Sequence, residues 1–340
     1  MTFRPRLFAV GCAFAQLLLV TPALHAARHT RVRKAAKPSW NAAAANNPAG
    51  NPILSSPAQS GNAVLRAQIL LDRAHFSPGE IDGRFGSSTS GAVAAFNQAR
   101  KINAHAEVAA ATWQALNADP APVIVPYSVT AEDLAGPFNP IPENMDDKAK
   151  LPTLGYESPA EELGERFHVS PKLLAALNPG VKLDRAGEVI QVPNVARTPI
   201  EKVPGLTIHI SKSQGAVEAV DMNGVVRARY PATTGSEHDP LPLGTWKIKG
   251  VAWNPHFNYN PSLFWDADAT DTKAKLAPGP NNPVGVVWID LNIPHYGIHG
   301  TPVPSTIGKT TSHGCIRLTN WDATELAKMV TPGTPALLGE

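Results

Sequence analysis

The chain has 340 residues, of which 43% are hydrophobic and 17% charged, and it is therefore long enough for two or three domains with packed cores. Its 30 Lys and Arg residues nearly balance 28 Asp and Glu residues, which excludes the strong positive field that a nucleic-acid partner requires. Two cysteines exclude a disulfide-rich scaffold and a Cys-rich zinc module.

Residues 1–26 have the pattern of a secretory signal peptide. Two arginines precede an apolar run, and a stretch with small residues ends at Ala26. A membrane anchor is the alternative, but the run is shorter than the ~20 residues that span a bilayer. We expect an exported mature chain without a membrane span, located in the periplasm or cell wall. Cleavage would remove Cys12 and leave Cys315 as the one thiol.

Residues 27–61 are rich in Ala, Asn, Pro and Ser and contain few large apolar side chains. Such a composition buries too little surface to offset the entropy of the chain. We therefore predict a flexible linker that ends where the first helical pattern begins.

Three helices are predicted in residues 62–118, where apolar side chains recur at helical spacing. Ser88 or Thr89 is placed to cap the second helix. The turn Asp82–Gly86, followed by Thr89 and then by Phe96, resembles the motif of the three-helix peptidoglycan-binding domain. A small helical spacer would show the same periodicity and is the alternative.

Residues 125–195 predict a strand, two short helices and a closing strand. Ser158 and Ser170 each precede a proline, which is typical of a helix start, and Asn178 begins a helix stop. This βααβ order resembles a LysM module, a family that binds N-acetylglucosamine-containing glycans, with an insertion after the first strand. A structural spacer is the alternative.

Residues 205–339 predict a mostly β domain. Apolar and polar residues alternate in 206–210, 225–230 and 245–249, and residues 286–289 are β-branched and aromatic. Helical periodicity returns only at 321–329. The chain as a whole therefore reads as a multidomain α+β protein.

Two motifs in this β domain carry reactive side chains. His299 is followed by Gly300, and Ser312-His313-Gly314-Cys315 is followed by Ile and Arg317. A thiol attacks carbonyl carbons as a thiolate, and an imidazole can take its proton and hold the charge as an ion pair. Spacing leaves open which of the two histidines is the base.

Other residues of the second motif suit acyl transfer. Gly314 lacks a Cβ, so the backbone can direct successive N–H groups at an oxyanion, and Arg317 offers a fork for a substrate carboxylate. A buried inert cysteine and a surface ion pair are the alternatives. A metal site is also conceivable, but the spacing of His299, His313 and Cys315 fits no common zinc pattern, and we expect no metal.

Together these motifs resemble the YkuD-like L,D-transpeptidase catalytic domain over about residues 206–338. A Pro-x-Gly-Thr-aromatic strand at 242–246 belongs to the same pattern. The resemblance implies roles for seven residues. Cys315 would be the nucleophile, His299 the base, and Gly300 the source of the carbonyl that orients the base. His313 and Gly314 would shape the site and its oxyanion hole, and Arg317 and Ser312 would contact the substrate.

The resemblance further implies the reaction. Cys315 would form a thioester at the diaminopimelate–D-Ala bond of a stem tetrapeptide, and an acceptor amine would resolve it, giving a 3→3 cross-link without a cofactor. Peptidoglycan stem peptides and glycan are the implied partners, and carbapenems the implied inhibitors. Alternatives are a hydrolase of stem peptides or wall-protein linkages on the same scaffold, and a non-catalytic peptidoglycan-binding protein. The sequence leaves open the acceptor, sugar binding by the LysM-like segment, the domain arrangement over the active site, and the oligomeric state.

Overall fold

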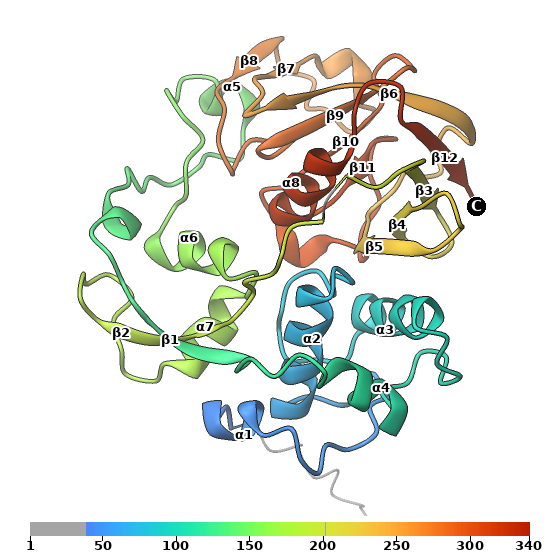
Figure 1. Ribbon diagram of the computed structural model, residues 1–340. Helices are drawn as coiled ribbons and strands as arrows, with labels where there is room; N and C mark the ends of the chain where they lie inside the picture. The colour runs from blue at the N-terminus through green and yellow to red at the C-terminus, as the bar shows by residue number, and fades with distance from the viewer. Residues whose placement is uncertain (1–38, 201) are drawn as a thin grey trace, which may run out of the picture. The chain divides into compact units, whose positions relative to one another are not determined.

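The computed structural model describes residues 39–200 and 202–340, so the predicted signal peptide and the start of the predicted linker lie outside the described residues. We name three parts in chain order: the helical region (39–118), the middle region (124–193) and the sheet region (206–340) (Figure 1). Among the described residues, no helix has the length and apolar character needed to cross a membrane.

The helical region contains the three predicted helices and one more. The helices are α1 (Ala42–Asn46), α2 (Asn62–Arg73), α3 (Ser87–Ala99) and α4 (Ala110–Leu116). The rings of Phe76 and Phe96 meet edge to face with centroids 5.5 Å apart, which is a favourable aromatic geometry. The predicted apolar faces of α2, α3 and α4 are buried, which confirms the periodicity argument.

The prediction that all of residues 27–61 form a flexible linker is wrong for the part from residue 39 onward. Ala45 and Leu54 are buried, and Leu54 and Val108 exchange two backbone hydrogen bonds of 2.9 and 3.3 Å. Arg66 donates to the carbonyl of Ala45 at 3.3 Å. Small side chains and backbone pairing anchor this segment, whereas the prediction counted only large apolar side chains.

The predicted cap of α3 is also wrong. The helix begins at Ser87 after an extended Gly86, and no side chain caps it. Thr89 lies inside the helix and is buried, where its hydroxyl accepts a hydrogen bond of 3.1 Å from Gln68 Nε2. This internal bond occupies the hydroxyl that the prediction assigned to capping.

The middle region pairs its first and last segments as an antiparallel two-stranded sheet. Ser158 and Ser170 cap α6 and α7, as predicted, by accepting from the backbone amides of Glu161 and Leu173. The elements are β1 (Ile124–Ser128), η1 (Glu132–Leu134), α5 (Met145–Lys148), α6 (Pro159–Arg166), α7 (Pro171–Leu177) and β2 (Val189–Pro193). This region shares one hydrophobic core with the helical region. Its LysM-like character stays a prediction.

The sheet region is built on eight strands in the order β11-β10-β9-β6-β12-β3-β4-β5, with β10–β11 and β12–β3 parallel. The strands are β3 (Thr207–Ser211), β4 (Ala216–Val220), β5 (Val226–Pro231), β6 (Gly244–Trp253), β9 (Val287–Leu291), β10 (Gly297–His299), β11 (Ile316–Arg317) and β12 (Pro335–Gly339). Helix α8 (Asn320–Met329) contacts β9 and β10 (Figure 1).

A separate hairpin of β7 (Phe257–Tyr259) and β8 (Ala274–Leu276) is inserted between β6 and β9, with a short η2 (Pro261–Leu263) in its connection. Another short helix, η3 (Pro304–Thr306), follows β10. The hairpin packs on residues of α5 through a small apolar cluster. The connection between β7 and β8 supplies residues to the site described below.

The sheet's edge strand β5 is extended by a segment of the helical region. Arg229 donates its backbone N–H to the carbonyl of His75 at 2.9 Å, and Ser77 donates to the carbonyl of Arg229 at 2.8 Å. Phe76 therefore forms an isolated parallel bridge with Arg229. Backbone pairing thus ties the residues after α2 to the sheet.

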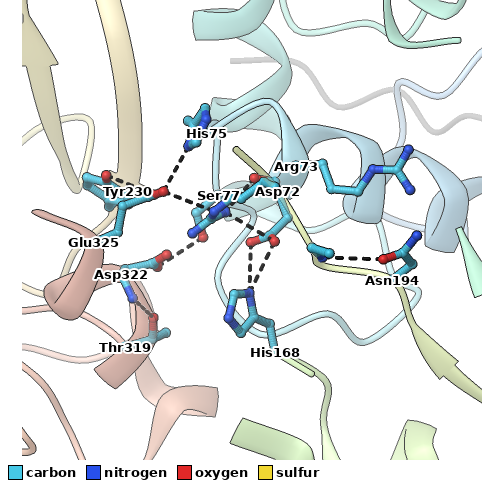
Figure 2. Close-up of polar contacts among 12 residues, drawn as sticks. Asp72, Arg73, His75, Ser77, His168, Asn194, Tyr230, Thr319, Asp322 and Glu325 are labelled. Carbon is cyan, nitrogen blue, oxygen red and sulfur yellow. Dashed lines mark hydrogen bonds and ion pairs between the residues drawn. The ribbon is translucent and has the colours of Figure 1, made fainter. Parts of the chain in front are cut away.

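A buried group of ionisable side chains, which we call the charge cluster (Asp72, His75, His168, Arg197, Glu325), joins all three regions (Figure 2). Asp72 lies 3.1 Å from His168 Nδ1 and 3.2 Å from Arg197 Nη1. Glu325 of α8 lies 2.9 Å from Arg197 Nε and 2.8 Å from His75 Nδ1. Burial raises the cost of each charge, and the close partners offset that cost.

Candidate active site

Two neighbouring parallel strands carry or directly adjoin the predicted reactive residues. In β10 and β11, Ile298 pairs with Ile316 and His299 pairs with Arg317. Because side chains alternate between the two faces of a sheet, His299 and its register partner Arg317 share one face, and Cys315 directly precedes β11. Folding therefore places the strand of His299 next to the strand that Cys315 directly precedes, which the sequence spacing could not establish.

The His299 ring is buried and held in one orientation. Its Nδ1–H donates to the carbonyl of Gly300 at 2.7 Å, and the Trp288 ring stacks on it with centroids 5.4 Å apart and planes 16° apart. Burial, and secondarily the charge of Arg317, lower the pKa of His299 to about 3. The imidazole is therefore neutral, and Nε2 keeps a free lone pair.

The thiol of Cys315 rests as a neutral group. Its Sγ donates to the carbonyl of His295 at 3.4 Å. Burial raises the pKa of Cys315, while the Gly297 amide and the Arg317 charge act in the opposite direction. The resting pair is thus a thiol and a neutral imidazole, which differs from the ion pair that the sequence analysis described.

The residues before Cys315 form a tight turn fixed by hydrogen bonds. Ser312 is buried and donates its hydroxyl to the carbonyl of Cys315 at 2.5 Å. Gly314 has φ +94°, and a Cβ there would lie 2.7 Å from a ring carbon of Tyr296. Both the left-handed backbone and the close ring require glycine at this position.

The predicted His313 and Arg317 form one wall of the site together with the hairpin connection. His313 Nε2 lies 2.7 Å from Asp266 Oδ1, and its Nδ1 lies 3.5 Å from Arg317 Nη2. The ring of Phe264 meets His313 edge to face with centroids 5.0 Å apart. His313 is therefore held within this wall by side-chain contacts to Asp266 and Arg317.

Asn320, the first residue of α8, supports the Gly300 peptide from behind. Its Oδ1 occupies the space where a Cβ at Gly300 or at Gly285 would stand, 2.1 and 2.0 Å from those positions. Its Nδ2 donates to the two carboxyl oxygens of Glu165 in α6 at 2.8 and 3.1 Å. Burial raises the pKa of Glu165 to about 8. The middle region therefore reaches the peptide that orients His299.

Four contributors escaped the sequence analysis: Trp288, Tyr296, Asp266 and Asn320. Trp288 was assigned to a strand, but the sequence did not indicate which strand would pair with it or that its ring would stack on His299. Asp266 lies in an irregular segment without periodicity. Asn320 directly precedes the predicted helix, and the polar residue at that place was the one usable signal.

Among residues 39–200 and 202–340, no three His, Cys, Asp or Glu side chains gather as possible metal ligands.

The fold and site define a class of α+β proteins with a buried histidine on one strand and a half-buried cysteine directly before the neighbouring strand, and comparisons with known proteins identify the family. Residues 206–338 match the L,D-transpeptidase catalytic domain (YkuD), and residues 60–116 match the putative peptidoglycan binding domain. The chain is 30% identical over 176 residues to the putative L,D-transpeptidase YkuD of Bacillus licheniformis, covering 51% of this chain and 89% of the relative. It is 31% identical over 170 residues to the Bacillus subtilis protein of the same name, covering 49% and 85%.

The chain therefore belongs to the L,D-transpeptidase family of the YkuD type. The probable L,D-transpeptidase YbiS of Escherichia coli is 27% identical over 191 residues, covering 53% of this chain and 60% of the relative. Among solved structures, L,D-transpeptidase 3 of Mycobacterium tuberculosis with a faropenem-derived adduct aligns with a TM-score of 0.34 at 18% identity, covering 46% of this chain and 75% of that one. The Xylanimonas cellulosilytica L,D-transpeptidase aligns with a TM-score of 0.35 at 16% identity, covering 84% and 98%.

Proposed function

We propose that this cell-wall L,D-transpeptidase is a cysteine acyltransferase that makes 3→3 cross-links between peptidoglycan stem peptides. The observation that supports the proposal is the pairing of β10 with β11, which brings the strand of His299, with its neutral ring and free Nε2, beside the strand that Cys315 directly precedes. The substrate would be a stem tetrapeptide, attacked at the bond between diaminopimelate and the terminal D-Ala.

Acylation follows from the protonation states of the two side chains. His299 Nε2 takes the thiol proton while Cys315 Sγ bonds to the carbonyl carbon of the donor. Backbone N–H groups of the turn at Gly314 receive the negative charge that develops on the carbonyl oxygen. The C–N bond then breaks, and the imidazolium gives its proton to the departing D-Ala amine.

Resolution of the thioester uses the same two residues. The acceptor amine attacks the thioester carbonyl and loses a proton to His299, and the C–S bond breaks to release Cys315, which regains that proton. Arg317 and Ser312 border the site, and Arg317 would meet a donor carboxylate. Because burial disfavours the thiolate, proton transfer during attack matters more than a preformed ion pair.

The other parts of the chain suit a wall enzyme. The peptidoglycan-binding match over residues 60–116 supports retention at the polymer, where local concentration raises the rate of encounter. Export to the periplasm or wall through residues 1–26 and glycan binding by the LysM-like middle region belong to this proposal. Carbapenems would acylate Cys315, since they present a strained carbonyl to the same nucleophile.

Mass spectrometry of purified muropeptides incubated with the protein tests the reaction. Wild type should release D-Ala and form dimers, whereas Cys315→Ala should do neither. Shortened monomers without dimers would overturn cross-linking and favour hydrolysis. Binding of sacculi with no change in muropeptide mass would favour the non-catalytic alternative.

A further inference from the structure

A second cavity lies apart from the cysteine, between the helical region and the sheet region. It has a volume of about 380 Å³ and is lined by the start of α3, the β3–β4 turn and two loops around residues 232–235 and 308–311. Its described lining contains two cations, Lys212 and Arg229, and no carboxylate, and the Glu340 carboxylate outside the lining lies 3.7 Å from Lys212 Nζ. The hydroxyl groups in the lining belong to Ser87, Ser88, Ser213, Thr234, Thr310 and Thr311.

Arg229 is buried because α3 covers the outer face of β5. Along this strand Ala228 and Tyr230 point into the core, so Arg227 and Arg229 point outward. The side chain of Arg227 is 53% exposed, but that of Arg229 is only 4% exposed. A Cβ at Gly91 of α3 would lie 2.3 Å from Arg229 Nη2, so glycine at 91 admits the guanidinium.

This buried guanidinium lacks the partners that burial demands. Arg229 Nη1 is shielded from solvent and has no hydrogen-bond partner among the described residues. The nearest carboxylate oxygen, Glu218 Oε1, lies 3.9 Å from Nε, which is too long for a hydrogen bond. Burial lowers the pKa of Arg229 accordingly. An uncompensated buried charge is costly, so a missing partner at this place is informative.

The start of α3 adds a second source of positive potential. The helix has 13 residues, and no side chain caps it at Gly86. The amides of Ser87 and Ser88 belong to the first turn, whose N–H groups have no partner within a helix. Together with the helix dipole, these amides favour an anion beside the two cations.

We propose that this cavity is an oxyanion-binding site that takes a carboxylate or phosphate group between Arg229, Lys212 and the first turn of α3. Its volume leaves room for several more atoms of the molecule that bears the group, since a water occupies about 30 Å³. The site borders the catalytic loop, because Ser312 donates its backbone N–H to the carbonyl of Thr234 at 3.2 Å.

A carboxylate of a second stem peptide is the source that we favour, and this choice rests on the proposed function. The wall polymer would bring such carboxylates to any enzyme that joins its stems. A ligand here would contact the helical region and the loop leading to Cys315 at the same time.

Titration of the full mature chain with inorganic phosphate at constant ionic strength tests the site. The melting temperature of wild type should rise with phosphate concentration in a saturable manner, because a ligand that binds only the folded state stabilises the folded state. Arg229→Met should weaken the apparent affinity at least about tenfold, as expected for the loss of a charge-assisted hydrogen bond. Arg227→Met, a matched change two residues away on the same strand, should leave the affinity unchanged.

Lys212→Met provides a second variant in case Arg229→Met does not fold, since Lys212 is partly exposed and its loss should weaken phosphate binding several-fold. No saturable stabilisation of wild type would overturn the site, as would an unchanged affinity in both Arg229→Met and Lys212→Met. Carbapenem acylation measured on the same samples by intact mass reports on Cys315 separately, so failure of this site and failure of the proposed function are distinguishable.

A disaccharide tripeptide, which lacks the terminal D-Ala of a donor, identifies the source of the oxyanion. We expect it to displace phosphate from wild type and to bind Arg229→Met more weakly. If the tripeptide does not compete with phosphate, the stem peptide is overturned as the source, while saturable phosphate binding still supports the oxyanion site.

Discussion

The strand pair at Cys315 and the charge cluster beneath α8 handle burial in opposite ways. At the strands, burial keeps both reactive groups uncharged, because it lowers the pKa of His299 and raises that of Cys315. In the charge cluster, Asp72 has no solvent exposure, and Arg197 and the nearby His residues hold its pKa below the usual range. Proximity of opposite charges decides the outcome, since desolvation opposes the charged form in both places.

The difference indicates that the ionisable groups that stabilise contacts between the regions are distinct from the groups proposed to react. Side chains that link the three regions are paired with each other, whereas burial keeps uncharged the two groups that we propose to exchange a proton. The experiments below test this division, beginning with the largest expected effect.

Removing the base should have the largest effect. His299→Gln keeps a hydrogen-bonding side chain but loses the free imidazole nitrogen, so we expect the rate of carbapenem acylation to fall about 10²–10⁴-fold. Intact mass against time measures the rate. The exposed His256→Gln should acylate at the wild-type rate, and an unimpaired His299→Gln would refute the assignment of the base.

Breaking the support of the Gly300 peptide should have the next largest effect. Asn320→Ala removes the amide behind Gly300 and leaves Glu165 with only the Tyr156 hydroxyl as a side-chain donor, so we expect acylation about tenfold slower. Glu162→Gln on the same helix as Glu165 serves as the control. A lower melting temperature with an unchanged acylation rate would show that Asn320 only stabilises the fold.

The pH dependence of acylation tests whether the imidazole is neutral at rest. His299 loses its basic form only as the pH falls through its pKa of about 3, and Cys315 with its raised pKa gains thiolate as the pH rises. The rate should therefore increase from pH 5 to pH 9 without an inflection near 6.5. Trp288→Leu would admit water to the ring and should bring such an inflection toward 6.5. An inflection near 6.5 in wild type would contradict the desolvated ring.

The smallest expected effect concerns Asp322, which lies beside the charge cluster. Burial, and secondarily the charge of Asp72, raise the pKa of Asp322 to about 8, and Ser77 donates its hydroxyl to the carboxyl group at 2.9 Å. The folded state therefore keeps a proton that the unfolded state releases above its ordinary pKa near 4, so this group lowers stability as the pH rises from 4 to 8.

Asp322→Asn should remove that part of the pH dependence. We expect the variant to melt about 2–4 °C higher than wild type at pH 8 and at a similar temperature at pH 4. Thermal unfolding followed by circular dichroism measures this difference, with the exposed Asp147→Asn as the control. A variant that melts lower than wild type at pH 8 would show that the carboxylate is charged and needed there.

Features that depend on interactions between neighbouring residues could be predicted from the sequence, and features that depend on contacts between distant segments could not. The helices, the alternating strands and the serine caps of α6 and α7 follow from local patterns, and the structure confirms them. The pairing of His299 with Arg317, two residues after Cys315, depends on strand order, because β11 pairs with β10 only after a long connection. Asp266, Trp288 and Asn320 reach the site from irregular or distant segments, where no periodicity reports which residue they meet.

The failed predictions have the same origin. Residues 39–61 contain few large apolar side chains, yet Arg66 donates to the carbonyl of Ala45, and Leu54 pairs with the backbone of Val108. Thr89 was predicted to cap a helix, but its hydroxyl accepts a hydrogen bond from Gln68, twenty-one positions earlier. Such partners are chosen by tertiary packing, which composition and spacing do not record.

The pairing of residues 75–77 with β5 has a consequence for how the protein avoids self-association. An open edge strand is a template for another molecule's backbone, and many proteins must blunt it with charges or prolines. Here residues 75–77 of the same chain pair with that edge at Arg229. Removing the first hundred residues to isolate the sheet region would uncover the backbone N–H and carbonyl of Arg229 on this edge, and the truncated protein should aggregate more readily than the intact chain.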